Sequence, residues 1–160
     1  MIKEQTLAKY LKHLLLGDRF ACRRVIEEVM QSGVPANSVY LNVIWPIMVE
    51  IEKLNREDRI TPTQEHLATR INRTIVDQLQ NKLPKRENKD KKVTICCAQE
   101  ELQELGAQMI ADLFESDGWE VRFLGGGLSN DDIYAFINNY GPDLLVVTDQ
   151  RPSRPPLYDF

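Results

Sequence analysis

Ile60-Thr-Pro-Thr-Gln-Glu-His-Leu-Ala-Thr69 is the stretch from which the architecture of the first half of the chain can be read. Pro62 suits the first turn of a helix, because its fixed φ matches the helical value and its missing N–H needs no partner there. Thr61 is the N-cap candidate, and Gln64 stands three residues later, which completes a capping box. The stretch therefore predicts a helix that begins at Pro62 and runs to about Leu83.

Glu65 and His66 fall in the first turn of this helix. The helix dipole favours a carboxylate there whatever its function. An imidazole at such a position is either a metal ligand or a capped, hydrogen-bonded residue, and both interpretations of His66 stay open. A Glu-His pair at a helix start suggests a bundle that presents polar groups to a ligand on a second domain.

Three further helices are predicted before this one. Apolar residues recur at helical spacing over residues 2–15, 19–31 and 35–54. Pro46 lies inside the third of these helices and predicts a kink or a local break. With short connections between them, the four segments predict an all-α four-helix bundle over residues 1–83.

The second half of the chain changes period. Residues 84–92 are charged, contain a proline and are predicted as a solvated linker. After them, short apolar runs alternate with helical segments. The predicted strands and helices are 93–98, 105–116, 120–124, 131–140 and 143–148. This alternation predicts an α/β Rossmann-like (flavodoxin-like) domain over residues 93–160, with a parallel sheet that binds ligands beyond the carboxyl ends of its strands.

The predicted sheet is incomplete towards the C-terminus. Its third strand, residues 143–148, would be interior in a flavodoxin-like order, with a fourth strand beside it. The sequence from there to Phe160 predicts no such strand. We therefore expect an apolar strand at the edge of the sheet, either because the chain is truncated or because a partner covers that edge.

The composition restricts the classes of function. The net charge of −4 argues against nucleic acid as a direct partner. Cys22, Cys96 and Cys97 lack the spacing of a metal site or a disulfide framework and are interpreted as small core residues in a reducing compartment. No signal peptide or membrane span is predicted, so we expect a cytoplasmic protein without membrane contact. No nucleophile and base stand at a workable spacing, which predicts that the chain is not an enzyme.

Five segments of the sequence together resemble the cobalamin-binding module of corrinoid methyltransferases and cobalamin-dependent light-sensing regulators. These segments are Tyr40–Pro46, Ile60–Thr69, Leu105–Val121, Leu124-Gly125 and Asp131–Ile133. The resemblance covers nearly the whole chain. It implies a helical lid that faces a Rossmann-like base, with a corrinoid as the expected cofactor.

The lid carries one departure from the family pattern. Asn55 stands ten residues before Glu65, where the family has a Trp that covers the upper face of the corrin. Glu65 and His66 are kept. The resemblance therefore implies upper-face contacts from these residues, although Asn55 is equally an ordinary residue for the end of a helix.

The lower face carries a second departure. The family has an Asp-x-His-x-x-Gly motif whose His ligates cobalt, and the matching residues here are Glu101, Gln103 and Gly106. A Gln amide oxygen is a far poorer donor to cobalt than an imidazole nitrogen. We therefore expect no ligation of cobalt from below by this protein, so that a corrinoid would bind with its own base attached or with water below. Simple helix-start chemistry explains Glu101 and Gln103 equally well.

Two further edges of the sheet complete the candidate site. Gly125 and Gly126 either allow close approach of the backbone to a ligand or form a sharp turn. Thr148 stands where the family has the Ser of a Ser-x-Leu motif. The candidate cofactor-binding residues are Asn55, Glu65, His66, Glu101, Gln103, Gly106, Gly125, Gly126 and Thr148. His66 is the candidate metal ligand.

These observations favour a sensory or regulatory module of the cobalamin-binding fold. Such a module binds a corrinoid or another tetrapyrrole without a protein His below, or has lost the cofactor, and signals by association with itself or with a partner protein. Three alternatives stay open: a corrinoid carrier of a methyltransferase system, a haem-binding sensor with His66 as axial ligand, and a cofactor-free interaction module.

Overall fold

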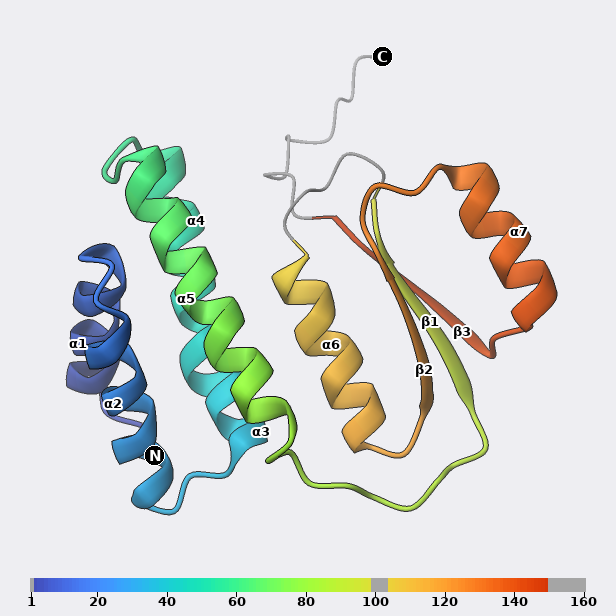
Figure 1. The fold of residues 1–160 in the computed structure, drawn as a ribbon, viewed down its shortest axis with the longest axis horizontal. Coiled ribbons are helices and arrows are strands. Elements are labelled where there is room, and N and C mark those ends of the chain that lie inside the picture. Colours follow the sequence, from blue (N-terminus) through green and yellow to red (C-terminus); the bar gives the residue numbers. More distant parts are fainter. Residues whose placement is uncertain (1, 99–103, 150–160) are drawn as a thin grey trace, which may run out of the picture. The chain divides into compact units, whose positions relative to one another are not determined.

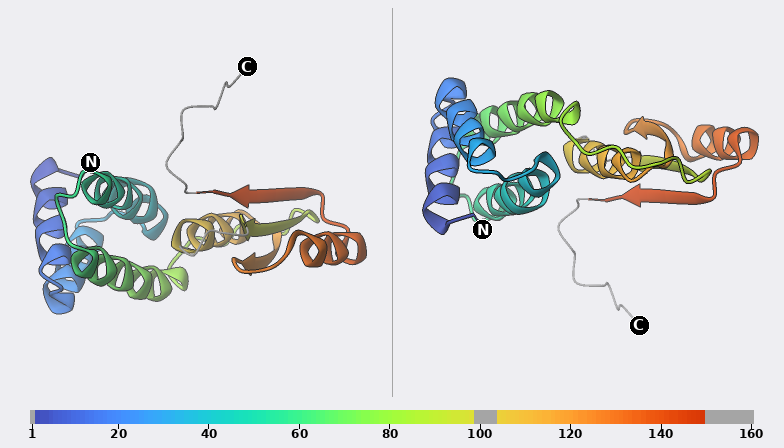
Figure 2. Two further views of the ribbon diagram at one scale, coloured as in Figure 1. Left: turned by 90° about the horizontal axis from the view of Figure 1, so that it is seen from above. Right: turned by 90° about the horizontal axis from the view of Figure 1, so that it is seen from below.

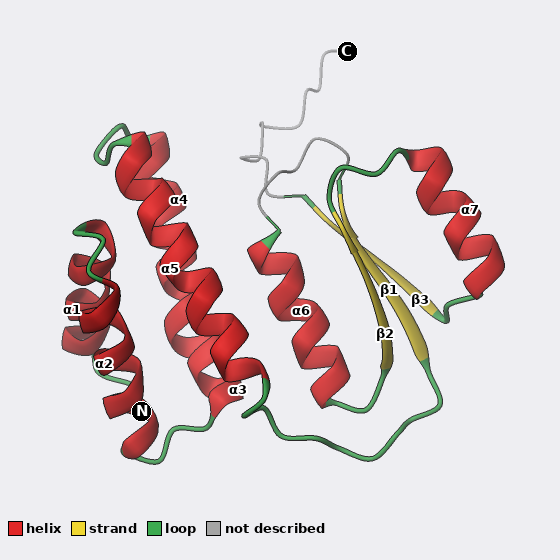
Figure 3. Ribbon diagram, in the orientation of Figure 1, coloured by secondary structure: helices red, strands yellow, loops and turns green. Residues whose placement is uncertain are grey.

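The structure is a computed structural model that describes residues 2–98 and 104–149. It divides into two compact units, Met1–Pro84 and Lys85–Phe160. The first unit contains helices and the second contains a sheet with helices (Figure 3). Helical bundle and parallel sheet follow one another in the predicted order, and the predicted fold class is confirmed.

The first unit is a helical bundle whose helices are drawn in blue to green in Figure 1. Its elements are α1 (Glu4–Leu15), α2 (Arg19–Gln31), α3 (Ala36–Val39), η1 (Tyr40–Ile44), α4 (Trp45–Arg56) and α5 (Pro62–Gln80). Because α3, η1 and α4 follow one another without interruption, the described part of this unit amounts to four helices. Apolar side chains at helical spacing on each of them are buried in the centre, as the periodicity predicts. α5 ends at Gln80, slightly before the predicted end at Leu83.

The local break predicted at Pro46 is the π-helical segment η1, which directly precedes Trp45 and Pro46. Proline has no N–H to donate, and its ring clashes with the carbonyl oxygen four residues earlier in a regular α-helix. One wider turn removes this conflict while the helix continues. The buried side of the segment stays apolar, with Tyr40, Val43 and Ile44 fully enclosed.

Two tyrosines place polar groups inside the bundle. Tyr10 Oη donates a hydrogen bond to Asn72 Oδ1 at 2.6 Å, and Tyr40 Oη donates to the Val76 carbonyl oxygen at 3.0 Å. Both bonds are buried and join residues far apart in the sequence. They fix α1 and η1 against α5, because a buried polar group without its partner is costly.

In its described residues, 85–98 and 104–149, the second unit is a three-stranded parallel sheet with one helix on each face (Figures 1 and 3). The elements are β1 (Lys92–Cys97), α6 (Leu105–Ser116), β2 (Glu120–Gly125), α7 (Asn130–Tyr140) and β3 (Leu144–Thr148). The strand order is β2-β1-β3, and both pairings are parallel. The chain therefore moves to one side of β1 for β2 and to the other side for β3. Right-handed crossovers then require α6 and α7 to lie on opposite faces.

The core of this unit lies between β1 and α6. Val93, Ile95 and Cys97 point to this face and pack against Ala107 and Ala111. The alternate residues of β1 are also buried, since the strand is central and covered on both faces. This is why β1 shows a continuous apolar run rather than alternation.

The charged segment predicted as a solvated linker makes specific contacts within the second unit. The Arg86 N–H donates to the Ser116 carbonyl oxygen at 2.9 Å, and the Lys89 N–H donates to that of Gly118 at 3.0 Å. The side chains of Arg86 and Lys89 both form ion pairs with Asp117. The segment is therefore attached to the turn between α6 and β2.

β3 forms one edge of the sheet, as Figure 2 shows. Within the described ranges it pairs with β1 alone. Leu145 and Val147 are 42% and 56% exposed, so the expected apolar edge is present. No helix in the described residues is both long enough and apolar enough to cross a lipid bilayer.

Candidate functional site

The first turn of α5 is built as the sequence predicts. The Gln64 N–H donates to Thr61 Oγ1 at 3.1 Å, and the Thr61 N–H donates to Gln64 Oε1 at 2.9 Å. This reciprocal pair is a complete capping box. It fixes the start of α5, so that Glu65 is half-buried and the following His66 is exposed. The imidazole is therefore free to meet a ligand.

Asn55 lies at the same end of the bundle as Glu65 and His66, because α4 and α5 are connected by a short turn there (Figure 1). Its carbonyl oxygen accepts the Asp58 N–H at 3.1 Å, which closes the last turn of α4. Asp58 then takes a left-handed conformation with φ 55°. The three predicted residues of the helical unit are thus brought together at one end by this turn.

The carboxyl end of the sheet gathers the predicted residues of the second unit. Gly125 ends β2, Gly126 follows it, and Thr148 ends β3. The Ala98 N–H donates to the Thr148 carbonyl oxygen at 2.7 Å, which joins the end of β1 to that of β3. Gly106 is buried in the first turn of α6. Glu101 and Gln103 lie outside the described residues.

Sequence reasoning missed one residue at this edge. Glu104 directly precedes α6, and its Oε1 accepts the Gly126 N–H at 2.7 Å. Gly125 has φ 68°, a left-handed value that favours glycine, and a Cβ at this position would lie 2.8 Å from the same oxygen. The available signal was a carboxylate at a helix start combined with paired glycines after the neighbouring strand.

The cysteines form no site. Cys22, Cys96 and Cys97 are buried and form no disulfide. Burial raises the pKa of Cys22 to about 12, with nearby Asp18 adding to the effect and Arg23 opposing it. Burial also raises the pKa of Cys96. Neutral, enclosed thiols behave as small apolar side chains, which agrees with their interpretation as core residues.

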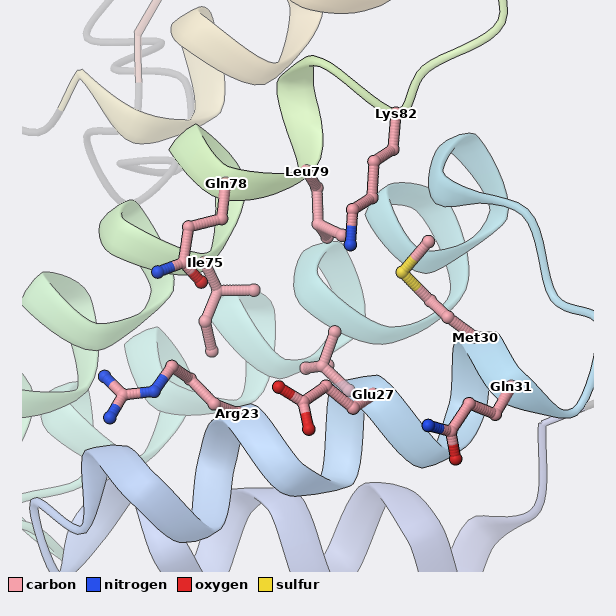
Figure 4. Close-up of a pocket in the computed structure, with 9 residues that line it drawn as sticks. Arg23, Glu27, Met30, Gln31, Ile75, Gln78, Leu79 and Lys82 are labelled. Atoms are coloured by element: carbon pink, nitrogen blue, oxygen red, sulfur yellow. The ribbon is translucent and has the colours of Figure 1, made fainter.

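A separate cavity of about 300 Å³ opens between α2 and α5 (Figure 4). It is lined by Arg23, Ile26, Glu27, Met30, Gln31, Ile75, Gln78, Leu79 and Lys82. Charges of both signs surround an apolar floor, so the lining selects neither an anion nor a cation. None of the predicted site residues lies in it.

The candidate ligands of the described residues fit a corrinoid better than a bare metal ion. The described residues contain no group of three or more His, Cys, Asp or Glu side chains that could hold a bare metal ion. A corrin ring supplies four nitrogen ligands to cobalt itself, so a protein that binds it would not need a cluster of metal ligands of its own. An exposed His66 and a glycine loop at the carboxyl edge of the sheet fit such a group, each within its own unit.

The comparisons with known proteins bear directly on this fit. The profile of the family described as "B12 binding domain" matches residues 6–80. This match covers nearly the whole of the helical unit, which therefore resembles a B12 binding domain. The match spans α1 to α5 and includes the capped Glu65-His66 start of α5. The suspected relationship to cobalamin-binding proteins is thereby confirmed.

Solved structures extend the likeness from the B12 binding domain to the sheet. The monomethylamine corrinoid protein of Methanosarcina barkeri has a TM-score of 0.74 at 16% identity, over 91% of this chain and 70% of that one. The methanol:cobalamin methyltransferase complex MtaBC of the same organism has a TM-score of 0.53 at 13% identity, over 91% of this chain and 57% of that one. At these identities the likeness concerns the fold. No curated protein matches the sequence.

The comparisons also bear on the alternatives to cobalamin. The matched family is a B12 binding domain, and the similar structures are described as corrinoid or cobalamin proteins. Neither finding supports the haem alternative.

Proposed function

We propose that this chain binds a corrinoid and acts as a sensory or regulatory module that signals by protein association. The observation that carries the proposal is the B12 binding domain match over residues 6–80, which includes an exposed His66 held at a capped helix start. The glycine loop at the carboxyl edge of the parallel sheet supports it, because doubly wound sheets bind ligands there.

The side chains have separate parts in this proposal. His66 and Glu65 would meet the upper face of the corrinoid, and Asn55 would leave more room there than an indole. Gly125 and Gly126 would let the backbone approach the ligand. The bound group would supply the cobalt chemistry, while the protein binds and orients it.

The proposal of a sensor rests on Gln103 in the sequence. In the family, a His at this position ligates cobalt from below during methyl transfer. The carboxamide of Gln103 is a poor cobalt ligand and does not replace that imidazole. A sensor needs only an affinity for the cofactor that differs between the free protein and the protein associated with itself or a partner. We accordingly propose that the chain holds cobalamin with its own base attached and catalyses no reaction by itself.

Absorption spectra of the purified chain with methylcobalamin and adenosylcobalamin test how the cofactor is held. We expect a spectrum with the cofactor's base still coordinated, which is unchanged in Gln103→Ala, and we expect His66→Ala to weaken binding of the cofactor. A displaced base whose spectrum changes in Gln103→Ala would show that Gln103 ligates cobalt and would contradict the proposal.

A second candidate is a corrinoid carrier of a methyltransferase system. The fold likeness to the monomethylamine corrinoid protein favours it. The two candidates differ in what binding changes. A sensor changes its sedimentation or its partner binding when adenosylcobalamin is added or photolysed, whereas a carrier accepts a methyl group from a partner enzyme and keeps its association state.

A further inference from the structure

Glu104 connects two loops at the carboxyl edge of the sheet. It is the residue before α6, yet its side chain makes no capping hydrogen bond to its own helix. Instead Oε1 accepts the Gly126 N–H at 2.7 Å, across the sheet edge on the loop that follows β2. A carboxylate that accepts an amide N–H makes a stronger bond than a neutral acceptor does.

The end of β2 is shaped to receive this carboxylate. Ile95 pairs with Phe123, but the next residue of β1, Cys96, pairs with Gly125, so that Leu124 is an extra residue in a β-bulge. Bulges re-aim the backbone and are frequent beside functional sites. At Gly125 a Cβ would lie 2.8 Å from Glu104 Oε1. A side chain at position 125 would therefore displace the carboxylate from this contact.

Two hydrogen bonds hold backbone segments together at the carboxyl edge of the sheet. Ala98 and Thr148 connect β1 to β3 through a backbone hydrogen bond of 2.7 Å. Glu104 connects the start of α6 to the loop after β2. We call Glu104, Gly125 and Gly126 the Glu104 clamp. Through it, the loop after β2 is attached to the start of α6.

We propose that Glu104 is a positioning residue for the corrinoid. This inference rests on the proposed function, since it concerns the same sheet edge. A loop ordered in advance lowers the conformational entropy that binding must otherwise remove, and so raises affinity. The clamp acts through the Gly126 amide and the backbone around it, with no contact between Glu104 and the ligand.

Three variants of the full chain test the clamp. Glu104→Ala removes the acceptor, Glu104→Gln keeps an Oε1 that accepts the same N–H, and Glu115→Ala removes an exposed carboxylate from the other end of α6. Two quantities are measured: hydrogen exchange of the Gly126 amide without ligand, and adenosylcobalamin affinity by absorption titration. Thermal unfolding of each variant monitors the fold.

In Glu104→Ala we expect Gly126 exchange to be faster and cobalamin affinity to be weaker, each by about tenfold, the range of a lost charged hydrogen bond. In Glu104→Gln we expect affinity within about threefold of the unchanged chain, because a neutral acceptor retains part of the bond. Glu115→Ala should leave both quantities unchanged.

The contrary outcomes separate the inference from the proposed function. Unchanged Gly126 exchange in Glu104→Ala overturns the clamp. Faster exchange with unchanged cobalamin affinity overturns its positioning role. An equal loss of cobalamin affinity in Glu115→Ala also overturns the positioning role. So does a loss of affinity in both Glu104→Ala and Glu104→Gln that is accompanied by unfolding of both variants. If the unchanged chain binds no cobalamin, the proposed function fails, and Gly126 exchange still reports whether the clamp forms.

Discussion

Tyr10 and Asn72 form a buried pair whose two members depend on each other. Tyr10 Oη donates to Asn72 Oδ1, and Asn72 Nδ2 has no hydrogen-bond partner among the described residues. Tyr10→Phe leaves the amide wholly unpaired, and we expect it to lower the free energy of unfolding by about 1–3 kcal/mol. Tyr10→Phe with Asn72→Leu should recover most of this loss, since no polar group then remains. Urea unfolding measures both, and additive losses would contradict the account.

Cys22 makes the stability of the helical unit sensitive to alkaline pH. Its pKa is raised from 9.0 to about 12, chiefly by burial. The folded state therefore holds the thiol proton more tightly than the unfolded state does. The contribution of this proton to the free energy of unfolding is complete below pH 9.0 and is lost as the pH rises towards 12. We expect stability to fall more steeply over this window in the unchanged chain than in Cys22→Ala. Parallel unfolding curves of the two proteins would refute the assignment.

The start of α5 is an element whose stability rests on one side chain. Thr61→Ala removes the acceptor for the Gln64 N–H, and we expect a loss of about 1 kcal/mol in the free energy of unfolding. Thr63→Ala is the matched control, because Thr63 is exposed in the same turn and makes no side-chain hydrogen bond within the described ranges. Its effect should stay within about 0.5 kcal/mol. Equal losses in chemical denaturation would mean that the capping box adds nothing.

The turn between α6 and β2 depends on Gly118 for space as well as for conformation. A Cβ there would lie 2.0 Å from the Glu87 carbonyl oxygen, whereas a Cβ at Gly141 would meet nothing within 4 Å, and both residues have positive φ. We expect Gly118→Ala to cost about 3 kcal/mol or more and Gly141→Ala only about 1–2 kcal/mol of conformational strain. Similar unfolding free energies for the two variants would show that the charged segment 85–91 does not limit the space for a side chain at position 118.

Elements were predictable where local chemistry alone determines them. Helices and strands with clear periodicity were found with small shifts at their ends, and Thr61 with Gln64 fixed the start of α5. The attachment of Arg86 and Lys89 to the α6–β2 turn could not be predicted, because it is a tertiary contact of a segment whose sequence is typical of a polar linker. The role of Glu104 was missed for the same reason, since its partner lies 22 residues away.

At the scale of the whole molecule, the candidate site residues fall into two groups. Asn55, Glu65 and His66 lie at one end of the helical unit, and Gly125 and Thr148 lie at the carboxyl edge of the sheet. The pattern of elements predicts each group separately. The proposal of a corrinoid as ligand rests on the resemblance and on the family match, because neither periodicity nor spacing distinguishes one planar cofactor from another.

Equilibrium dialysis of the full chain against adenosylcobalamin tests the central claim most directly. The account predicts saturable retention of one cobalamin per chain, weakened in Glu104→Ala and not in Glu115→Ala. Retention no greater than that of an unrelated protein at the same concentration would contradict it.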